Sequence, residues 1–168
     1  MRIILDVCFA AFIAVSITVA STASAHAQSK SYELPSDLPK IVQEAVEKNK
    51  KQCEDGEKPG FKQGFLTLKD INGDGKPDYI LDYGHFQCGE FVTMFCGTGG
   101  CLTEIFATDG DGGYIDVWNE SARRIRFATI KKRPAMLIDL HGSACGRVGA
   151  DACAMTLYWN GNKFHPAN

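Results

Sequence analysis

Apolar positions near the start of the chain repeat with the period of a helix. They occupy the i, i+1, i+4 and i+5 positions of one helical face, at Ile41, Val42, Ala45 and Val46. Ser36 is the expected N-cap, because a serine oxygen can accept a hydrogen bond from the free amides of the first turn. The pattern predicts a helix over residues 37–51.

From Phe61 onward the pattern changes to β-branched and aromatic runs separated by glycine, which is typical of strands joined by tight turns. Strands are expected at 61–69, 78–83, 102–107, 113–118, 123–129, 134–140, 154–159 and 163–165. Since no further helical periodicity interrupts these runs, the predicted fold is mainly β. We expect an antiparallel sheet or small sandwich, with the N-terminal helix packed on one face.

The β region contains an internal repeat. Four residues recur 57 positions later: Pro77, Asp82, Cys88 and Gly89 as Pro134, Asp139, Cys145 and Gly146. Four more recur at an offset that shrinks from 52 to 50: Cys101, Phe106, Gly110 and Tyr114 as Cys153, Tyr158, Gly161 and Phe164. Two related strand-hairpin units are therefore predicted, at about 61–118 and 119–166. Two units are too few for a closed propeller.

The first 27 residues have the features of a secretory signal peptide. Arg2 precedes an apolar run over 7–20, and Ala25-His26-Ala27 is a small-x-small cleavage site. Residues 28–35 are expected to form a flexible leader, and 36–168 a single disulfide-bonded β domain. The apolar run is short for a membrane helix, so no membrane span is expected after processing. The predicted location is periplasmic or secreted.

Six of the seven cysteines lie beyond the predicted cleavage site, and an even number in an exported chain indicates three disulfides. Cys145–Cys153 is the clearest pair, because it closes a short loop between successive strands. Two pairings remain for the other four: Cys88–Cys101 with Cys53–Cys96, or Cys96–Cys101 with Cys53–Cys88. The second is favoured, because the glycine-rich loop 97–100 closes with little strain.

The segment from Asp70 to Asp78 carries the clearest chemistry. Oxygen-bearing side chains occupy positions 1, 3, 5 and 9 of a short loop, at Asp70, Asn72, Asp74 and Asp78. Calcium requires six to eight oxygen ligands, and a loop with this spacing turns alternate side chains inward. Gly75 permits the sharp turn, and Lys76 would contribute its backbone carbonyl. One calcium ion with a structural role is predicted, against the alternative of a plain metal-free hairpin turn.

Residues 66–82 resemble the strand–calcium loop–strand unit of FG-GAP and VCBS-type repeats. The resemblance implies the same five ligand positions, but it covers about one tenth of the chain. Unlike an EF-hand, the loop has Leu81 at position 12 and strands on both sides. In the second unit the equivalent positions hold no ligand: Phe127, Thr129, Lys131 and Ala135. The rest of the chain, including 95–101 and 141–146, resembles uncharacterised exported bacterial proteins, which implies a location and a fold but no activity.

Two other groups are candidates for function. Asp139, His141 and Ser143 share one face of a strand, but side chains two residues apart project in parallel and rarely form a hydrolytic triad. Basic residues concentrate over 123–133, which is typical of a solvated hairpin face; the alternative is contact with an anionic envelope component or an acidic secreted protein. The net charge of −2 argues against a nucleic-acid partner held by bulk electrostatics.

These features predict an exported, calcium-binding, non-enzymatic protein with a binding or envelope-accessory role. An inhibitor of a secreted hydrolase, such as a lysozyme or a protease, is the alternative among binding proteins. A hydrolase that uses His141 and Ser143 is the alternative among enzymes.

Overall fold

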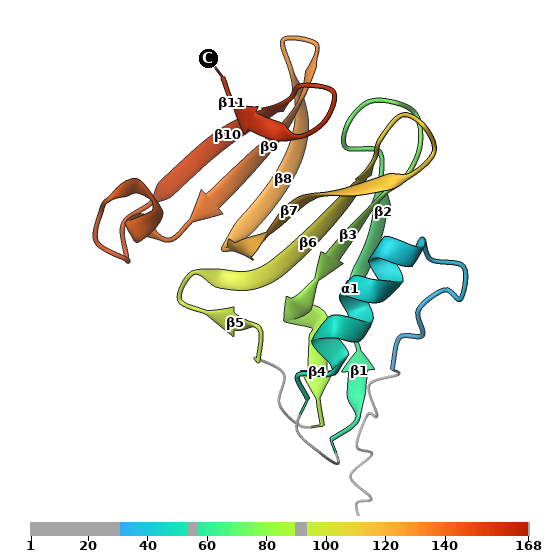
Figure 1. The fold of residues 1–168 in the computed structure, drawn as a ribbon. Helices are drawn as coiled ribbons and strands as arrows, with labels where there is room; N and C mark the ends of the chain where they lie inside the picture. The colour runs from blue at the N-terminus through green and yellow to red at the C-terminus, as the bar shows by residue number, and fades with distance from the viewer. Residues whose placement is uncertain (1–30, 54–56, 90–93, 168) are drawn as a thin grey trace, which may run out of the picture.

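The computed structural model describes residues 31–53, 57–89 and 94–167 (Figure 1). These residues form one helix, α1 (Lys40–Lys50), eleven strands and two 3₁₀ turns, η1 (Tyr83–His85) and η2 (Gly142–Cys145). The strands are β1 (Pro59–Phe61), β2 (Leu66–Lys69), β3 (Asp78–Asp82), β4 (Phe86–Cys88), β5 (Cys96–Gly97), β6 (Gly100–Thr108), β7 (Tyr114–Ala122), β8 (Arg124–Ile130), β9 (Arg133–Leu140), β10 (Cys153–Trp159) and β11 (Phe164–Pro166). The prediction of a mainly β protein with one N-terminal helix is confirmed.

All described strand pairs are antiparallel, and two sheets share one connectivity. Strands β2, β3, β6 and β7 lie side by side in the first, and β8, β9, β10 and β11 in the second. A 3₁₀ turn follows the second strand of each sheet. The two halves of the β region are therefore two copies of one four-stranded meander. In the first copy β5 also pairs with β6, and β4 forms a separate two-stranded sheet with β1.

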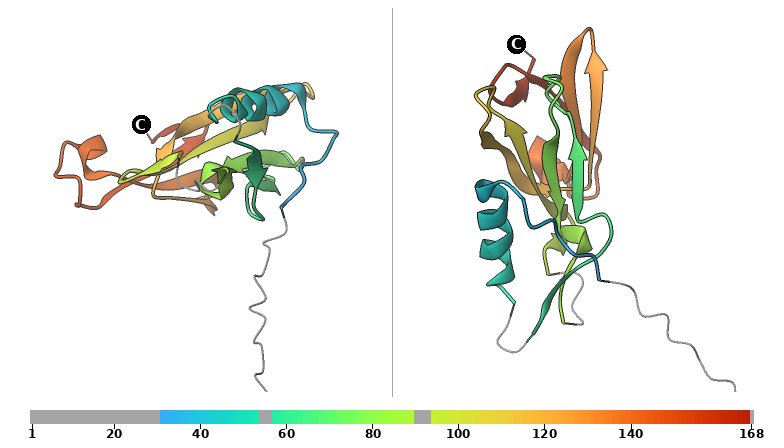
Figure 2. Two further views of the ribbon diagram at one scale, coloured as in Figure 1. Left: turned by 90° about the horizontal axis from the view of Figure 1, so that it is seen from below. Right: turned by 90° about the vertical axis from the view of Figure 1, so that its right-hand side faces the viewer.

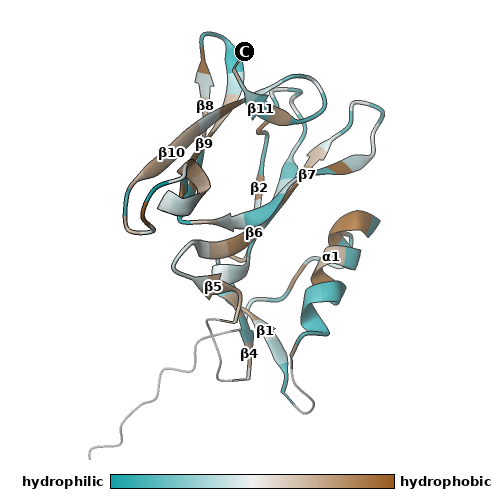
Figure 3. Ribbon diagram, turned by 60° about the vertical axis from the view of Figure 1, so that its left-hand side comes forward, coloured by the Kyte–Doolittle hydropathy of each residue, from teal (hydrophilic) through white to brown (hydrophobic). Residues whose placement is uncertain are grey.

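Two hydrophobic cores lie on opposite faces of the β2–β3–β6–β7 sheet (Figure 2). Helix α1 covers one face, and its core includes Val42, Leu81 and Phe106. The β8–β11 sheet covers the other face, and the core between the sheets includes Ile105 and Met136. Adjacent residues of β6 thus belong to different cores, as the alternation of side chains along a strand requires. Apolar residues run along β6 and β10 in Figure 3.

The helix is shorter at both ends than the prediction of 37–51. It runs from Lys40 to Lys50, and Pro39 occupies the N-cap position with φ −54° and ψ 144°. No side chain caps this end, so the expectation that Ser36 is the N-cap is wrong. A residue that precedes proline is disfavoured in the helical region, which keeps Leu38 outside the helix.

Most predicted strands match the structure to within a few residues, with three exceptions. The run 61–69 is split, because a turn that includes Gly64 (φ 101°) separates β1 from β2. Strand β7 continues to Ala122, four residues beyond the predicted end. Strands β4 and β5 have three and two residues and were not predicted, because such short runs carry no periodicity.

The three disulfides are Cys53–Cys88, Cys96–Cys101 and Cys145–Cys153, which is the pairing favoured from the sequence. Cys53–Cys88 ties the end of α1 to β4. Cys145–Cys153 joins η2 to β10 within the second meander. The repeat-equivalent cysteines of the first meander, Cys88 and Cys101, bond elsewhere. Three disulfides are typical of proteins from oxidising compartments. The predicted signal peptide over 1–27 lies outside the described residues.

A buried polar cluster lies beneath α1. Glu104 on β6 is 2% exposed, and its Oε2 accepts hydrogen bonds from Tyr83 Oη at 2.8 Å and from Asn49 Nδ2 at 3.4 Å. Burial raises the pKa of the Tyr83 hydroxyl, so this group stays a donor. The cluster thus orients the helix on the sheet through specific hydrogen bonds as well as apolar packing.

Candidate metal loop and associated sites

The Asp70–Asp78 loop connects the antiparallel strands β2 and β3, and its first carboxylate binds the loop's own backbone. Asp70 Oδ1 accepts from Gly73 N at 2.7 Å, and Oδ2 accepts from Gly75 N at 3.0 Å. Gly73 and Gly75 have φ values of 84° and 82°, which a side chain would make unfavourable. The glycines therefore let the chain fold around Asp70.

Asn72 and Asp74 each cap a turn within the loop. Asn72 Oδ1 accepts from Asp74 N at 3.0 Å, and Asp74 Oδ1 accepts from Lys76 N at 2.8 Å. Side-chain oxygens that bind the amide two residues ahead are typical of Asx turns. The alternating acidic and amide residues thus satisfy the loop backbone locally.

Thr108, at the end of β6, brings three of the predicted ligands together. Its hydroxyl donates to Asp74 Oδ2 and accepts from Asn72 Nδ2 at 3.0 Å. Its backbone amide donates to Asp78 Oδ1 at 2.9 Å, and that oxygen lies 3.4 Å from the hydroxyl. No sequence pattern indicated Thr108, because a chain separation of 30 or more residues hides this contact.

Asp78 is the most deeply buried of the predicted ligands, with no exposed surface. Its second oxygen accepts from Ile71 N at 2.8 Å, so both oxygens are hydrogen-bonded to amides. Desolvation raises the pKa of Asp78, and the charges of Asp74 and Asp70 act in the same direction. By contrast, the hydrogen bond from Thr108 lowers the pKa of Asp74.

The donor set fits calcium in kind, because carboxylate, amide and hydroxyl oxygens are the ligands this ion prefers. Asp74 Oδ2 and Asp78 Oδ1 lie beside the Thr108 hydroxyl, whereas Asn72 directs its amide nitrogen there and its Oδ1 accepts from Asp74 N. Asp70 is directed at two glycine amides. Lys76 supplies its amide to Asp74. Across the described ranges, no group of three or more histidine, cysteine, aspartate or glutamate side chains has an arrangement that could hold a metal ion.

The second meander has a different connection at the equivalent place. The β8–β9 turn consists of Lys131 and Lys132 alone, because Ile130 already pairs with Arg133. Both lysines have positive φ, 51° and 64°. The repeat therefore contains one long acidic loop and one tight basic turn.

His141 and Ser143 approach each other closely, with His141 Nδ1 2.7 Å from Ser143 Oγ. The same ring nitrogen accepts from Ser143 N at 3.4 Å, so His141 acts as the N-cap of η2. Asp139 instead lies near Arg124 and Arg126, at 3.8 and 3.5 Å. In the described part of the chain, no carboxylate lies within ion-pair distance of the His141 imidazole. The pair thus lacks the third group that orients a catalytic histidine.

A cleft of about 560 Å³ lies between the edge strands β2 and β8. Thr67 and Asp82 contribute polar groups from the first sheet, and Phe127 contributes an apolar wall from the second. His85 also lines the cleft, with its Nδ1 3.4 Å from Asp82 Oδ2 but without the geometry of a hydrogen bond. Sequence patterns cannot reveal this cleft, because it arises where two sheet edges meet.

No family model, no curated protein and no solved structure matches this chain. Within the ranges that the structure describes, no helix is both long enough and apolar enough to cross a membrane. Inference of a function therefore rests on the chain's own residues.

Proposed function

We propose that this protein is an exported, non-enzymatic binding module whose Asp70–Asp78 loop takes up one calcium ion that stabilises the fold. The observation that carries the proposal is Asp78, a fully buried carboxylate in a loop that also contains Asp70 and Asp74. Among the described residues, no lysine, arginine or histidine nitrogen lies within ion-pair distance of any of them. A buried carboxylate beside like charges is costly, and a divalent cation would remove that cost.

Calcium would act by stabilising the β2–β3 connection and its contact with the end of β6. Asn72, Asp74 and Asp78 would hold the ion through side-chain oxygens, and Asp70 would complete the ring after a change of its hydrogen bonds. These residues already accept hydrogen bonds from amides of their own loop, so the turn forms without the ion. Calcium would then stabilise a backbone conformation that already exists. A structural role follows, because few coordination positions would remain for a substrate.

The test is the thermal midpoint, Tm, measured by circular dichroism in chelator and in millimolar calcium. At about 100 times Kd, a bound ligand adds about 2.7 kcal/mol, or on the order of 10 °C for a domain of this size. We expect this rise in the natural protein and its loss in Asp74→Ala. Asp111→Ala is the matched control, because Asp111 is an exposed acid in the neighbouring β6–β7 turn. An unchanged Tm in the natural protein across this range would contradict the calcium proposal.

A hydrolase built on His141 and Ser143 is the second candidate, favoured by their 2.7 Å separation. The non-enzymatic role is preferred for two reasons. The imidazole nitrogen that faces Ser143 Oγ also caps the turn that carries Ser143, and Asp139 is engaged with two arginines. A catalytic serine needs a base that is itself oriented by a third group.

A further inference from the structure

The β8–β11 sheet has one face away from the core, and basic side chains gather on it. On β8, Ile125 and Phe127 pack in the core between the sheets, so Arg124 and Arg126 lie on the opposite face. Arg133 and Asp139 on β9 share that face, because they alternate with the buried Met136 and Ile138. We call this surface, together with the Lys131–Lys132 turn, the basic face.

The charge of the basic face is opposite to that of the whole chain. The basic face carries five lysine or arginine residues and one carboxylate, Asp139, a local net charge of +4 in a chain of net charge −2. Arg123 is separate from the basic face, because it donates to the carbonyls of Thr98 and Gly149. The remaining cations are exposed to solvent.

Neighbouring groups hold the arginines of the basic face in place. Arg133 stacks over the Tyr158 ring at 4.9 Å, and Asp139 lies between Arg124 and Arg126. One carboxylate between two guanidinium groups leaves an excess positive charge on rigid strands. Arg124 and Arg126 are two residues apart along β8, so their Cα atoms lie about 7 Å apart.

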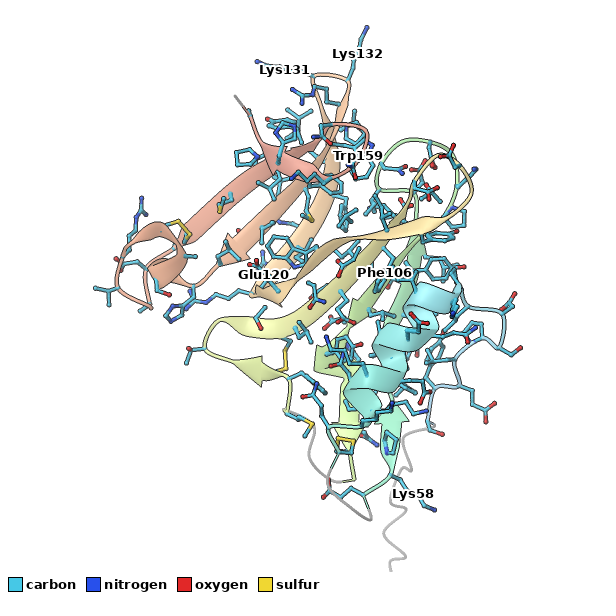
Figure 4. The ribbon with its side chains drawn as sticks, in the orientation of Figure 1. Lys58, Phe106, Glu120, Lys131, Lys132 and Trp159 are labelled. Carbon is cyan, nitrogen blue, oxygen red and sulfur yellow. A yellow bond between two sulfur atoms is a disulfide. The ribbon has the colours of Figure 1, made fainter. Side chains whose placement is uncertain are left out.

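The Lys131–Lys132 turn is unusual for its backbone. A two-residue turn with both φ values positive strongly prefers Asn-Gly, because glycine and asparagine tolerate left-handed backbone better than residues such as lysine. Two lysines therefore occupy positions where they lower stability. Both point away from the molecule at the tip of the β8–β9 hairpin (Figure 4). Residues that persist in unfavourable conformations are often retained for function.

We propose that the basic face binds a linear acidic polysaccharide, with the Lys131–Lys132 turn as an essential part of the contact. The inference deepens the proposed function, because it rests on the protein being a binding module. The excess positive charge of the basic face fits a polymer with repeated carboxylates, and arginine can bind a carboxylate through two hydrogen bonds. Insertion into a bilayer is disfavoured, since the large exposed hydrophobic residues of the described chain lie elsewhere, at Leu68, Met94 and Val148.

Charges on β8 have a competing explanation. Strand β8 is an edge of its sheet, and edge strands often carry charges that prevent aggregation. The turn lysines lie beyond the last paired residues, Ile130 and Arg133, so they cannot block the edge. The two explanations predict different outcomes for a variant of the turn.

The experiment is titration of the full chain with polygalacturonate, an unbranched polymer with one carboxylate per sugar, by calorimetry at low salt with a calcium chelator. The key variant is Lys131→Asn with Lys132→Gly. We expect affinity to fall about tenfold, as two cations are lost from an anionic contact, while Tm rises by about 5 °C as the turn relaxes. A gain in stability with a loss of binding separates this result from misfolding.

The matched control is Lys51→Gln with Lys58→Gln, which removes the same charge; Figure 4 places Lys58 at the opposite end of the molecule from the turn. We expect binding within twofold of the natural protein. Absent binding, an equal loss in the control, or tighter binding to single-stranded DNA or phosphatidylglycerol vesicles would overturn the proposal. So would a turn variant that aggregates but binds unchanged. Because the chelator removes calcium, failure of the calcium test leaves this result unaffected.

Discussion

Thr108 forms hydrogen bonds with three side chains of the acidic loop. It donates its hydroxyl to Asp74 and its amide to Asp78, and it accepts from Asn72. Both contacts lower the pKa of the carboxylate they reach, but the net shifts of the two pKa values have opposite signs. The pKa of Asp74 is lowered by the hydroxyl, whereas the pKa of Asp78 is raised by burial. A charged Asp74 therefore stabilises the fold at neutral pH, and a charged Asp78 opposes it.

Thr108→Val tests this arrangement, because it removes the hydroxyl and keeps the shape. We expect a loss of about 1 to 3 kcal/mol in the free energy of unfolding at pH 7, measured by urea denaturation. The pKa of Asp74 is depressed, so its stabilisation is present above the ordinary value of 3.8 and is lost as pH falls through the folded value. The difference in the free energy of unfolding between Thr108→Val and the natural protein should therefore become smaller below pH 3.8. Thr108→Ser keeps the hydroxyl and should stay close to the natural protein at every pH.

The local chemistry of the loop could be predicted from its sequence, but its surroundings could not. Acidic and amide side chains that alternate with glycine indicate a tight turn that curls around oxygen atoms. The structure places Asn72, Asp74 and Asp78 around one residue, whereas the Asp70 carboxylate faces two amides instead. The position of Thr108 depends on how β6 pairs with β3, and a loop sequence does not contain that register.

The three disulfides constrain elements over very different chain lengths. Cys53–Cys88 closes 35 residues and ties α1 to β4, whereas Cys96–Cys101 closes 5 residues within one hairpin. Cys145–Cys153 closes 8 residues. A crosslink restricts the unfolded chain more when it closes a longer loop. The elements around α1 should therefore depend most on their disulfide.

Replacing both cysteines of each pair by alanine tests which disulfide stabilises the fold most. From loop length, removal of Cys53–Cys88 should lower the free energy of unfolding by about 4 kcal/mol, against about 2 kcal/mol for Cys96–Cys101 and about 2.5 kcal/mol for Cys145–Cys153. Urea denaturation without reductant gives the three values. A larger loss for the Cys96–Cys101 variant than for the Cys53–Cys88 variant would contradict the expectation.

The sequence predicted whether an element is a helix or a strand where its hydrophobic pattern extends over seven or more residues. Strands β6 to β10 have seven to nine residues of β-branched and aromatic character, and each was predicted. The start of α1 was missed, because the effect of Pro39 on its predecessor outweighs the apolar stripe. Strands β1 and β4 pair only with each other, and three residues are too few to show an alternation.

At the scale of the molecule, the first meander is shared by both cores. Its outer face packs against α1, and its inner face packs against the second meander. A sandwich was predictable from two units of alternating strands, but the cleft between β2 and β8 was not, because it depends on how far two sheet edges diverge. Since one sheet completes both cores, loss of either should unfold the whole chain.

One substitution in each core tests this cooperativity. Val42→Ala removes contacts beneath α1, and Met136→Ala removes contacts between the sheets; both residues are fully buried. The two tryptophans, Trp118 and Trp159, pack against the second core, so fluorescence reports on that core alone. We expect the free energy of unfolding to fall by about 2 kcal/mol in Val42→Ala and by about 3 kcal/mol in Met136→Ala. In a cooperative molecule, Val42→Ala lowers the urea midpoint seen by fluorescence as much as the midpoint seen by circular dichroism. A fluorescence midpoint unchanged by Val42→Ala would mean that the helix and its core unfold separately from the sandwich.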